Sequence, residues 1–211
     1  MKKLIIILFL FLANEISAQQ NVQIEFKDLT NCSVKKTKID LVKFYISNIV
    51  LTKEGNQVWS EKNSCHLINS DEKSSLTLNF SIPDSIVFDS LKFNLGIDSL
   101  TSVSGVFGGD LDPTKGMYWA WNSGYINFKL EGTSDNCNTR KNEFQFHLGG
   151  YSGDQNALQT IVLKAEEHTV INLNLNSFFS KIDLSENNHI MSPGKQAVKF
   201  SKFVKSLFYV E

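Results

Sequence analysis

The sequence lacks an excess of charge of either sign: 21 Lys and Arg residues stand against 22 Asp and Glu residues, so the formal net charge is −1. It contains no basic tract with interleaved aromatic residues, which argues against a nucleic-acid partner. Beyond the first residues, no apolar run is long enough to cross a bilayer. We therefore expect a soluble mature chain with no membrane span.

The signatures of common enzyme classes are missing as well. There is no Ser-His-Asp order, no nucleophile elbow and no phosphate-binding glycine loop. No carboxylate pair stands out as that of a glycoside hydrolase. We predict a protein that is not an enzyme.

Cysteine is scarce, with only Cys32, Cys65 and Cys137 in the chain. In an oxidising compartment these three allow one disulfide with one thiol left over, or three unpaired thiols, and the spacing does not choose among the three pairings. No two of them form a close CxxC-type pair, so a metal site built on cysteine is the weaker interpretation.

The chain begins with Met1-Lys2-Lys3, continues with LIIILFLFLA, and reaches the small residues Ser17 and Ala18 before Gln19. A short basic start, a brief apolar stretch and small residues at a cleavage point are typical of a secretory signal. We predict a signal peptide over 1–18, a single domain over 19–211, and a periplasmic or secreted location.

Sixteen phenylalanines and only three prolines favour a core filled by strands. The apolar pattern predicts the strands 22–26, 66–68, 75–82, 91–97, 125–131 and 143–148, and an antiparallel pair 158–165 and 169–175 that turns at Glu166-Glu167. The stretch 39–51 is rich in β-branched and aromatic residues and is expected to form one long strand, or two with a kink at Ser47-Asn48. This pattern indicates an all-β fold, an antiparallel β-sandwich, with a closed barrel as second choice.

A short helix is predicted at the C-terminus. Ser192 is a good N-cap, Pro193 suits the first helical position, and apolar residues recur at helical spacing at Ala197, Phe200, Val204 and Leu207. A helical turn is also expected within 177–184. We expect the C-terminal helix to pack on one end of the sheets.

The hairpin formed by 125–131 and 143–148 is the most informative stretch. Ile126, Phe128 and Leu130 should point into the core together with Phe144, Phe146 and Leu148. If the loop closes symmetrically, Glu131 faces Glu143 and Asn127 faces His147. Counting by twos then places Tyr125, Trp121 and Trp119 on the face of His147, outside the main core.

For each of the following histidines and aspartates, a structural role is weighed against a role in binding a metal. His66 is expected to be a hydrogen-bonded structural histidine and His168 to be solvated. His147 and His189, from separate elements, could supply two imidazoles to copper, with Met191 as a soft donor. Asp110 and Asp112 form a DxD in a glycine-rich loop, for which an Asx turn is favoured over calcium.

Several separated motifs occur in one order: FYISNI over 44–49, GGDLDPTKGMYWAWNSGYINFKLEG over 108–132, FQFHLGG over 144–150 and HIMSPG over 189–194. This set resembles the MbnP-like family, periplasmic or secreted copper-binding proteins of bacteria that are associated with methanobactin-type operons and dihaem peroxidases. The resemblance spans most of the mature chain and also implies a β-sandwich.

The resemblance implies that copper is held by histidines and a kynurenine, which a partner dihaem cytochrome c peroxidase makes from tryptophan. Carried onto this sequence, the candidate for oxidation is Trp119, with Trp121 next, and the candidate ligands are His147 and His189. Some relatives have a histidine two residues after the modified tryptophan. Here that position is Trp121, so one family ligand is absent or replaced.

Two functions remain open from the sequence. The first is copper capture or handling in the periplasm or outside the cell. The second is a β-sandwich module without metal that binds a protein or glycan partner through exposed aromatic residues, since Trp and Tyr are favoured anchors.

Overall fold

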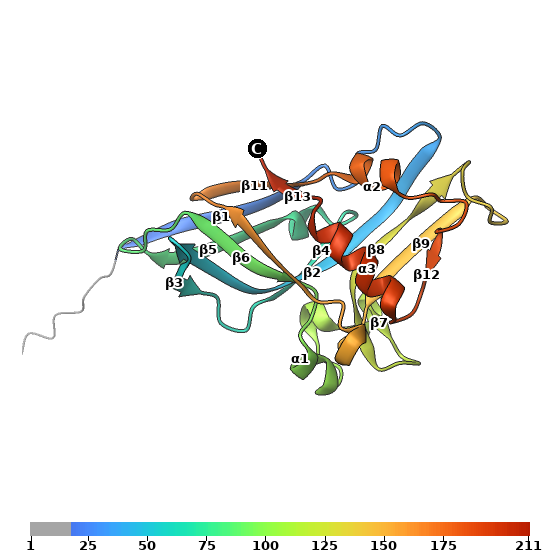
Figure 1. Cartoon of the computed structure of the whole chain (residues 1–211). Helices are drawn as coiled ribbons and strands as arrows, with labels where there is room; N and C mark the ends of the chain where they lie inside the picture. The colour runs from blue at the N-terminus through green and yellow to red at the C-terminus, as the bar shows by residue number, and fades with distance from the viewer. Residues whose placement is uncertain (1–17) are drawn as a thin grey trace, which may run out of the picture.

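The computed structural model describes residues 18–211 of the chain (Figure 1). The predicted signal peptide lies outside these residues except for Ala18. Within the described part, no helix has the length and apolar character needed to cross a membrane.

One of the two sheets has four strands, in the order β13-β11-β1-β5. Its members are β1 (Gln19–Lys27), β5 (Thr77–Pro83), β11 (His168–Leu173) and β13 (Phe208–Val210). In β1 every second side chain, at Val22, Ile24 and Phe26, is buried, as alternation predicts. The pairing of β1 with β11 is parallel, whereas its pairing with β5 is antiparallel.

The other sheet is larger and has the path β10-β6-β2-β8-β9-β12, with β3 and β4 also paired to β2 and β7 paired to β8. Its strands are β2 (Thr37–Lys53), β3 (Asn56–Ser60), β4 (Cys65–Asn69), β6 (Ser90–Leu95), β7 (Tyr118–Trp119), β8 (Gly124–Ser134), β9 (Glu143–Gly149), β10 (Gln159–Lys164) and β12 (His189–Ile190). The long strand β2 organises this sheet. Its ladder with β6 is interrupted between Ser47 and Val50, where Asn48 has a φ of +51°.

The main core lies between the two sheets and is rich in phenylalanine. Phe44 of β2 packs edge-on against Phe26 of β1 and Phe208 of β13, with ring centroids 5.5 and 5.4 Å apart. These contacts join residues from both sheets into one buried cluster. The predicted all-β sandwich is confirmed, with mainly antiparallel pairing and parallel pairs at β1–β11 and β12–β9.

Within residues 18–211, three short α-helices accompany the sheets: α1 (Ser99–Val103), α2 (Leu175–Lys181) and α3 (Lys195–Lys205). The predicted C-terminal helix is therefore confirmed. It contacts β9 and β10 (Figure 1) and buries Ala197, Phe200 and Val204, with Phe200 stacked on Phe146 at 5.4 Å.

The predicted start of α3 is wrong. The N-cap position is Gly194 instead of Ser192, and no side chain caps the helix there. Gly194 has φ +157° and ψ +177°, a combination that essentially only glycine adopts, so the chain cannot become helical before Lys195. Pro193 instead packs in the preceding loop, 3.2 Å from where a Cβ on Gly150 would lie.

The predicted pairing of the strands on either side of Glu166-Glu167 is also wrong. β10 pairs with β6 in the large sheet, and β11 pairs with β1 and β13 in the small one. The connection crosses between the layers: Ala165 N–H donates to Asp89 O, and Glu167 O accepts from Gln23 N–H. Strand pattern alone does not distinguish this crossover from a hairpin.

Gly132 lies where β8 leaves no room for a side chain against β2 and β9. A Cβ on Gly132 would meet the Lys38 carbonyl oxygen and would lie 2.6 Å from Cζ of Phe144. We expect Gly132→Ala to lower the free energy of unfolding by about 1–3 kcal/mol, because overpacking forces the strands apart. Urea titration of the mature chain measures this. The control is Gly108→Ala, at an extended glycine with nothing within 4 Å of the added carbon, and equal midpoints for both variants would contradict the packing.

Candidate functional site

His147 and His189 lie on one face of the large sheet. The cross-strand register aligns Lys43, Lys129 and His147 in one row across β2, β8 and β9. The adjacent row on the same face aligns Glu131, Gln145 and His189 across β8, β9 and β12. Because residues two apart on a strand share a face, the two imidazoles sit on neighbouring strands, one row apart, opposite the face that enters the main core.

The register of this hairpin differs from the symmetric closure that the sequence suggested. Glu131 lies opposite Gln145 instead of Glu143, and Lys129, not Asn127, lies opposite His147. The ladder shifts at Asn127, between Ile126 and Phe128. Asn127 turns toward the residues that follow β6, where its side-chain oxygen accepts a hydrogen bond from the Ile97 N–H at 3.1 Å.

The same shift moves Ile126 out of the main core, where it was predicted. It belongs to a second buried cluster with Trp119, Tyr125 and Tyr45. The other five predicted core residues of the hairpin remain in the main cluster: Phe128, Leu130, Phe144, Phe146 and Leu148. The bulge therefore separates two apolar cores along one strand.

His147 is oriented by a carboxylate. Its Nε2 lies 2.5 Å from Oε1 of Glu131, and only 5% of the residue is exposed. The hydrogen bond from His147 holds the pKa of Glu131 below its ordinary value, and the nearby charges of Lys129 and Lys43 act in the same direction. An ionised Glu131 accepts the Nε2–H, so the lone pair of a neutral His147 is on Nδ1.

A histidine that gives one N–H to a carboxylate is the arrangement commonly found at metal ligands, because the carboxylate fixes the tautomer and makes the free nitrogen more basic. Glu131 was not singled out from the sequence as a partner of His147. The pairing depends on a diagonal contact between β8 and β9, and it appears only once the register is known.

Trp119 reaches the same region from the short strand β7. β7 and β8 form their own hairpin, with Trp119 opposite Gly124, so counting by twos through 119–125 as one strand was wrong. The indole packs on Gly149, two residues past His147: a Cβ there would lie 2.7 Å from Cζ3 of Trp119. The structure thus places the Trp119 indole on Gly149, two residues along β9 from His147, by packing and not by strand periodicity.

The Nε1 of Trp119 is buried and has no hydrogen-bond partner among the described residues. Burying an unpaired N–H costs free energy, so such groups in native structures call for an explanation. Trp121 contrasts with it. It follows β7 in a turn, is 67% exposed, and has its ring centroid 6.0 Å from that of Trp119.

The loop before β7 is tied to the sheet by four side chains. The hydroxyls of Tyr45 and Tyr125 donate to the carbonyls of Asp110 and Leu111 at 3.1 and 3.2 Å. The ammonium groups of Lys43 and Lys129 donate to the carbonyls of Lys115 and Gly116 at 3.2 and 2.6 Å. The GGDLDPTKG motif therefore serves as the support that positions Trp119.

The two aspartates of this loop act within the fold. Asp112 accepts from the N–H and the hydroxyl of Thr114, which confirms the predicted Asx turn. Asp110 accepts from the Leu67 N–H and from the ammonium of Lys115. Both Asp110 oxygens are thus engaged by protein groups.

The remaining histidines have partners elsewhere. His66 Nε2 contacts both carboxylate oxygens of Glu61, at 2.9 and 2.8 Å, which confirms a hydrogen-bonded structural role. His168 lies on the small sheet, with Nε2 3.5 Å from Glu25 and its side chain 57% exposed. Neither lies near the face that carries His147 and His189 in register.

The donors on that face suit copper in part. Imidazole nitrogen is a ligand that copper accepts, and Met191, half-buried just after β12, offers a thioether for Cu(I). Within the described residues, however, no three His, Cys, Asp or Glu side chains come together as a metal site. The face thus offers two imidazoles in adjacent rows and no cluster of three such side chains.

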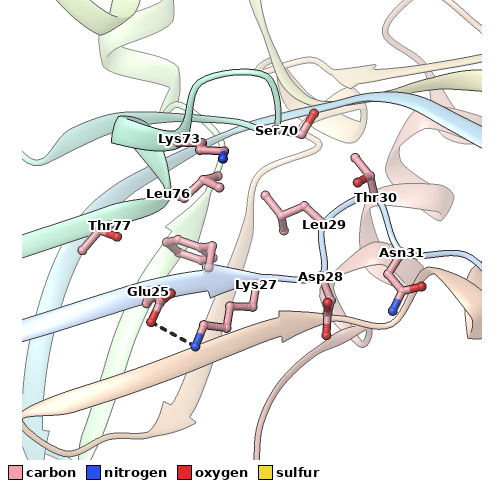
Figure 2. A pocket seen from close by; sticks show the side chains of 11 residues that line it. Glu25, Lys27, Asp28, Leu29, Thr30, Asn31, Ser70, Lys73, Leu76 and Thr77 are labelled. Carbon is pink, nitrogen blue, oxygen red and sulfur yellow. Dashed lines mark ion pairs between the residues drawn. The ribbon is translucent and has the colours of Figure 1, made fainter.

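A separate cleft of ≈ 490 Å³ lies at the end of β1, beside the 3-10 helix η1 (Lys73–Leu76) (Figure 2). It is lined by charged and polar groups, among them the ion pair of Lys27 with Glu25 at 3.3 Å. None of the site residues predicted from the sequence lines this cleft.

All three cysteines are free thiols in this structure. Burial, reinforced by the negative charges of Asp110, Asp98 and Glu61, raises the pKa of Cys65 to about 12. The thiolate is the form that binds metal or reacts. Cys65 is therefore a poor donor despite its place beside His66.

We expect Cys65 to resist alkylation of the folded chain by iodoacetamide at pH 8 and to react fully in denaturant. The reason is that the thiolate fraction is negligible well below a pKa of about 12. Peptide mapping after timed labelling measures the rate, with Cys65 in the unfolded chain as the internal control. Labelling of Cys65 at equal rates before and after unfolding would contradict this account.

Comparison with known proteins gives the family. A model of the MbnP family matches residues 11–192. Among solved structures, the chain is similar to MbnP from Methylosinus trichosporium, with a TM-score of 0.58 and 13% sequence identity over 80% of each chain, which shows a shared fold. A search of curated proteins finds no match. Because the family match covers well over half of the chain, as the sequence motifs indicated, this protein belongs to the MbnP family.

Proposed function

We propose that the chain is a periplasmic or secreted copper-binding protein that captures or passes on the metal without turnover. The observation that carries the proposal is the face shared by His147 and His189, with the unpartnered Nε1 of buried Trp119 next to it. Glu131 supports the same interpretation, because it accepts a hydrogen bond from His147 in the way that carboxylates commonly do from metal-binding histidines.

In this proposal His147 and His189 hold copper, and Met191 is available as a soft contact. A bound copper ion would supply charge and a coordination centre that draws the two imidazoles together. The chain's own residues orient and position these two ligands. Glu131 keeps the Nδ1 of His147 free, and β12 brings His189 to the edge of β9.

The missing donor is assigned to an oxidised Trp119. Conversion to kynurenine opens the five-membered ring and exposes a carbonyl and an aniline nitrogen beside His147. The indole loses four electrons and four protons and gains two oxygen atoms from water, and two molecules of hydrogen peroxide take up these electrons and protons and leave as four molecules of water. Hydrolysis then releases the formyl group as formate. A dihaem cytochrome c peroxidase is the proposed partner for this step.

Trp119 is a better candidate than Trp121 because of where each ring lies. Trp119 packs on Gly149, within the strand that carries His147, whereas Trp121 is largely in solvent. A carbonyl formed on Trp119 would be held in place by the surrounding second core. The same carbonyl on Trp121 would be exposed to water.

Removal of either imidazole should weaken Cu(I) binding by at least about 100-fold, since even outer-shell partners of a metal typically cost ~10–100-fold. The variants are His147→Gln, which keeps a hydrogen-bonding group for Glu131, and His189→Ala. Competition with a chromophoric Cu(I) chelator, on protein purified from native cells, measures the affinity.

The control for these variants is His168→Ala, which removes an exposed histidine on the other sheet and should bind copper like the parent. If His147→Gln and His189→Ala also bind like the parent, the assigned ligands are wrong. Thermal melting of each variant separates loss of binding from loss of fold.

Oxidation should be confined to Trp119 when the chain is made together with its native peroxidase. Mass spectrometry of the peptide that contains both tryptophans should give the mass expected when one tryptophan is replaced by kynurenine. Fragmentation of the peptide should place the kynurenine at position 119. Unmodified Trp119 from native cells, or kynurenine at Trp121 alone, would count against the proposal.

A second candidate function has its own observation. Leu100, Val103, Val106, Phe107 and Trp121 are all exposed apolar residues in or after α1 and in the turn after β7. Such residues are used to bind protein or glycan partners. Sugar-dependent quenching of tryptophan fluorescence that is lost in Trp121→Ala, in a chain that binds no copper, would favour this function.

A further inference from the structure

The two neighbouring tryptophans differ in their access to solvent. Trp119 is 5% exposed, and its indole is enclosed by the second core and by Gly149. Trp121 is 67% exposed, yet its ring centroid lies only 6.0 Å from that of Trp119, with the planes tilted by 49°. A large oxidant in solution can therefore approach Trp121 closely but not Trp119.

We propose that Trp121 is the surface residue through which Trp119 exchanges electrons with an external one-electron oxidant. This inference rests on the proposed function in one respect, namely that Trp119 is the residue finally oxidised. It adds the role of an electron relay for Trp121, at the position where some relatives carry a histidine.

The electron balance is simple. The external oxidant takes one electron from the indole of Trp121 and is reduced by one electron. Trp121 then takes one electron from Trp119 and returns to its starting state. The net result of one pass is one electron lost by Trp119 and one gained by the oxidant, and four such passes remove the four electrons that conversion to kynurenine requires.

The nearby tyrosines are less suited to this role. Tyr118 lies 5.0 Å from Tyr125, and Tyr125 lies 5.8 Å from Tyr45, so these rings form a second aromatic chain. The hydroxyls of Tyr45 and Tyr125, however, donate to backbone carbonyls. A carbonyl is too weak a base to take the proton that an oxidised phenol must lose, and burial raises the pKa of both hydroxyls.

The indole pair does not have this requirement. An indole can lose an electron while keeping its N–H proton, so the absence of an acceptor at Trp119 Nε1 does not block electron transfer. Electron transfer between rings falls steeply with distance, and the two indoles lie within the range of direct ring contact. Trp121 is thus the aromatic residue that joins the buried indole to the surface.

The test uses a photogenerated oxidant, ruthenium(III) tris-bipyridine formed by flash and persulfate, on the full mature chain with unmodified tryptophans. Trp121→Phe keeps an aromatic ring but is far harder to oxidise. The expected result is loss of most oxidation at Trp119, measured by peptide mass spectrometry. The matched control is Trp59→Phe, which alters the half-buried tryptophan that packs on Phe80 at 5.6 Å and should leave Trp119 oxidation unchanged.

A second readout follows the radical itself. Transient absorption should show a longer-lived Trp121 radical in Trp119→Phe, because this variant has no indole at position 119 to donate an electron to the radical. Equal oxidation of Trp119 in Trp121→Phe and the parent would overturn the relay, and so would an unchanged Trp121 radical lifetime. Neither result touches copper binding by His147 and His189, so failure of the relay is distinguishable from failure of the proposed metal site.

Discussion

The contact between Trp119 and Gly149 is the constraint on which the site depends. β9 can accept an indole on its outer face only because residue 149 has no side chain: a Cβ would lie 2.7 Å from the ring. Because Gly149 follows His147 by two positions on the same strand, this packing places the indole on the face of β9 that carries the imidazole.

The loop that precedes β7 fixes this contact from the other side. Two buried tyrosines and two lysines hold its carbonyls against the large sheet. The arrangement has a cost, since burial lowers the pKa of Lys129 and disfavours its charged form. Lys129 nevertheless contributes twice, because it holds the Gly116 carbonyl and also stabilises the ionised Glu131 that orients His147.

Much of the fold was predictable because alternation is a local signal. The strands, the two-layer core of phenylalanines and the C-terminal helix all follow from residues that lie close together in the sequence. The errors concern features that depend on distant hydrogen bonds. The bulge at Asn127 involves a hydrogen bond with Ile97, and the crossover after β10 involves hydrogen bonds with Asp89 and Gln23. The start of α3 is the exception, because it is set by the backbone conformation of Gly194.

The site was predictable only in part for the same reason. His147, His189 and Trp119 were named from motifs, and the structure places the two histidines on one face with Trp119 packed on Gly149 of the same strand as His147. Glu131 was missed because its contact with His147 is diagonal, and a symmetric closure paired it with another residue. The difference between Trp119 and Trp121 was also hidden, since the sequence does not show that a turn separates them.

The central claim is that one metal position joins His147, His189 and residue 119. Anomalous diffraction at the copper edge, on crystals of the protein isolated from native cells and loaded with Cu(I), tests it directly. We expect one strong peak between the two imidazoles and against the modified side chain at 119. A peak at His66 or His168, with none at the face of β9, would contradict it.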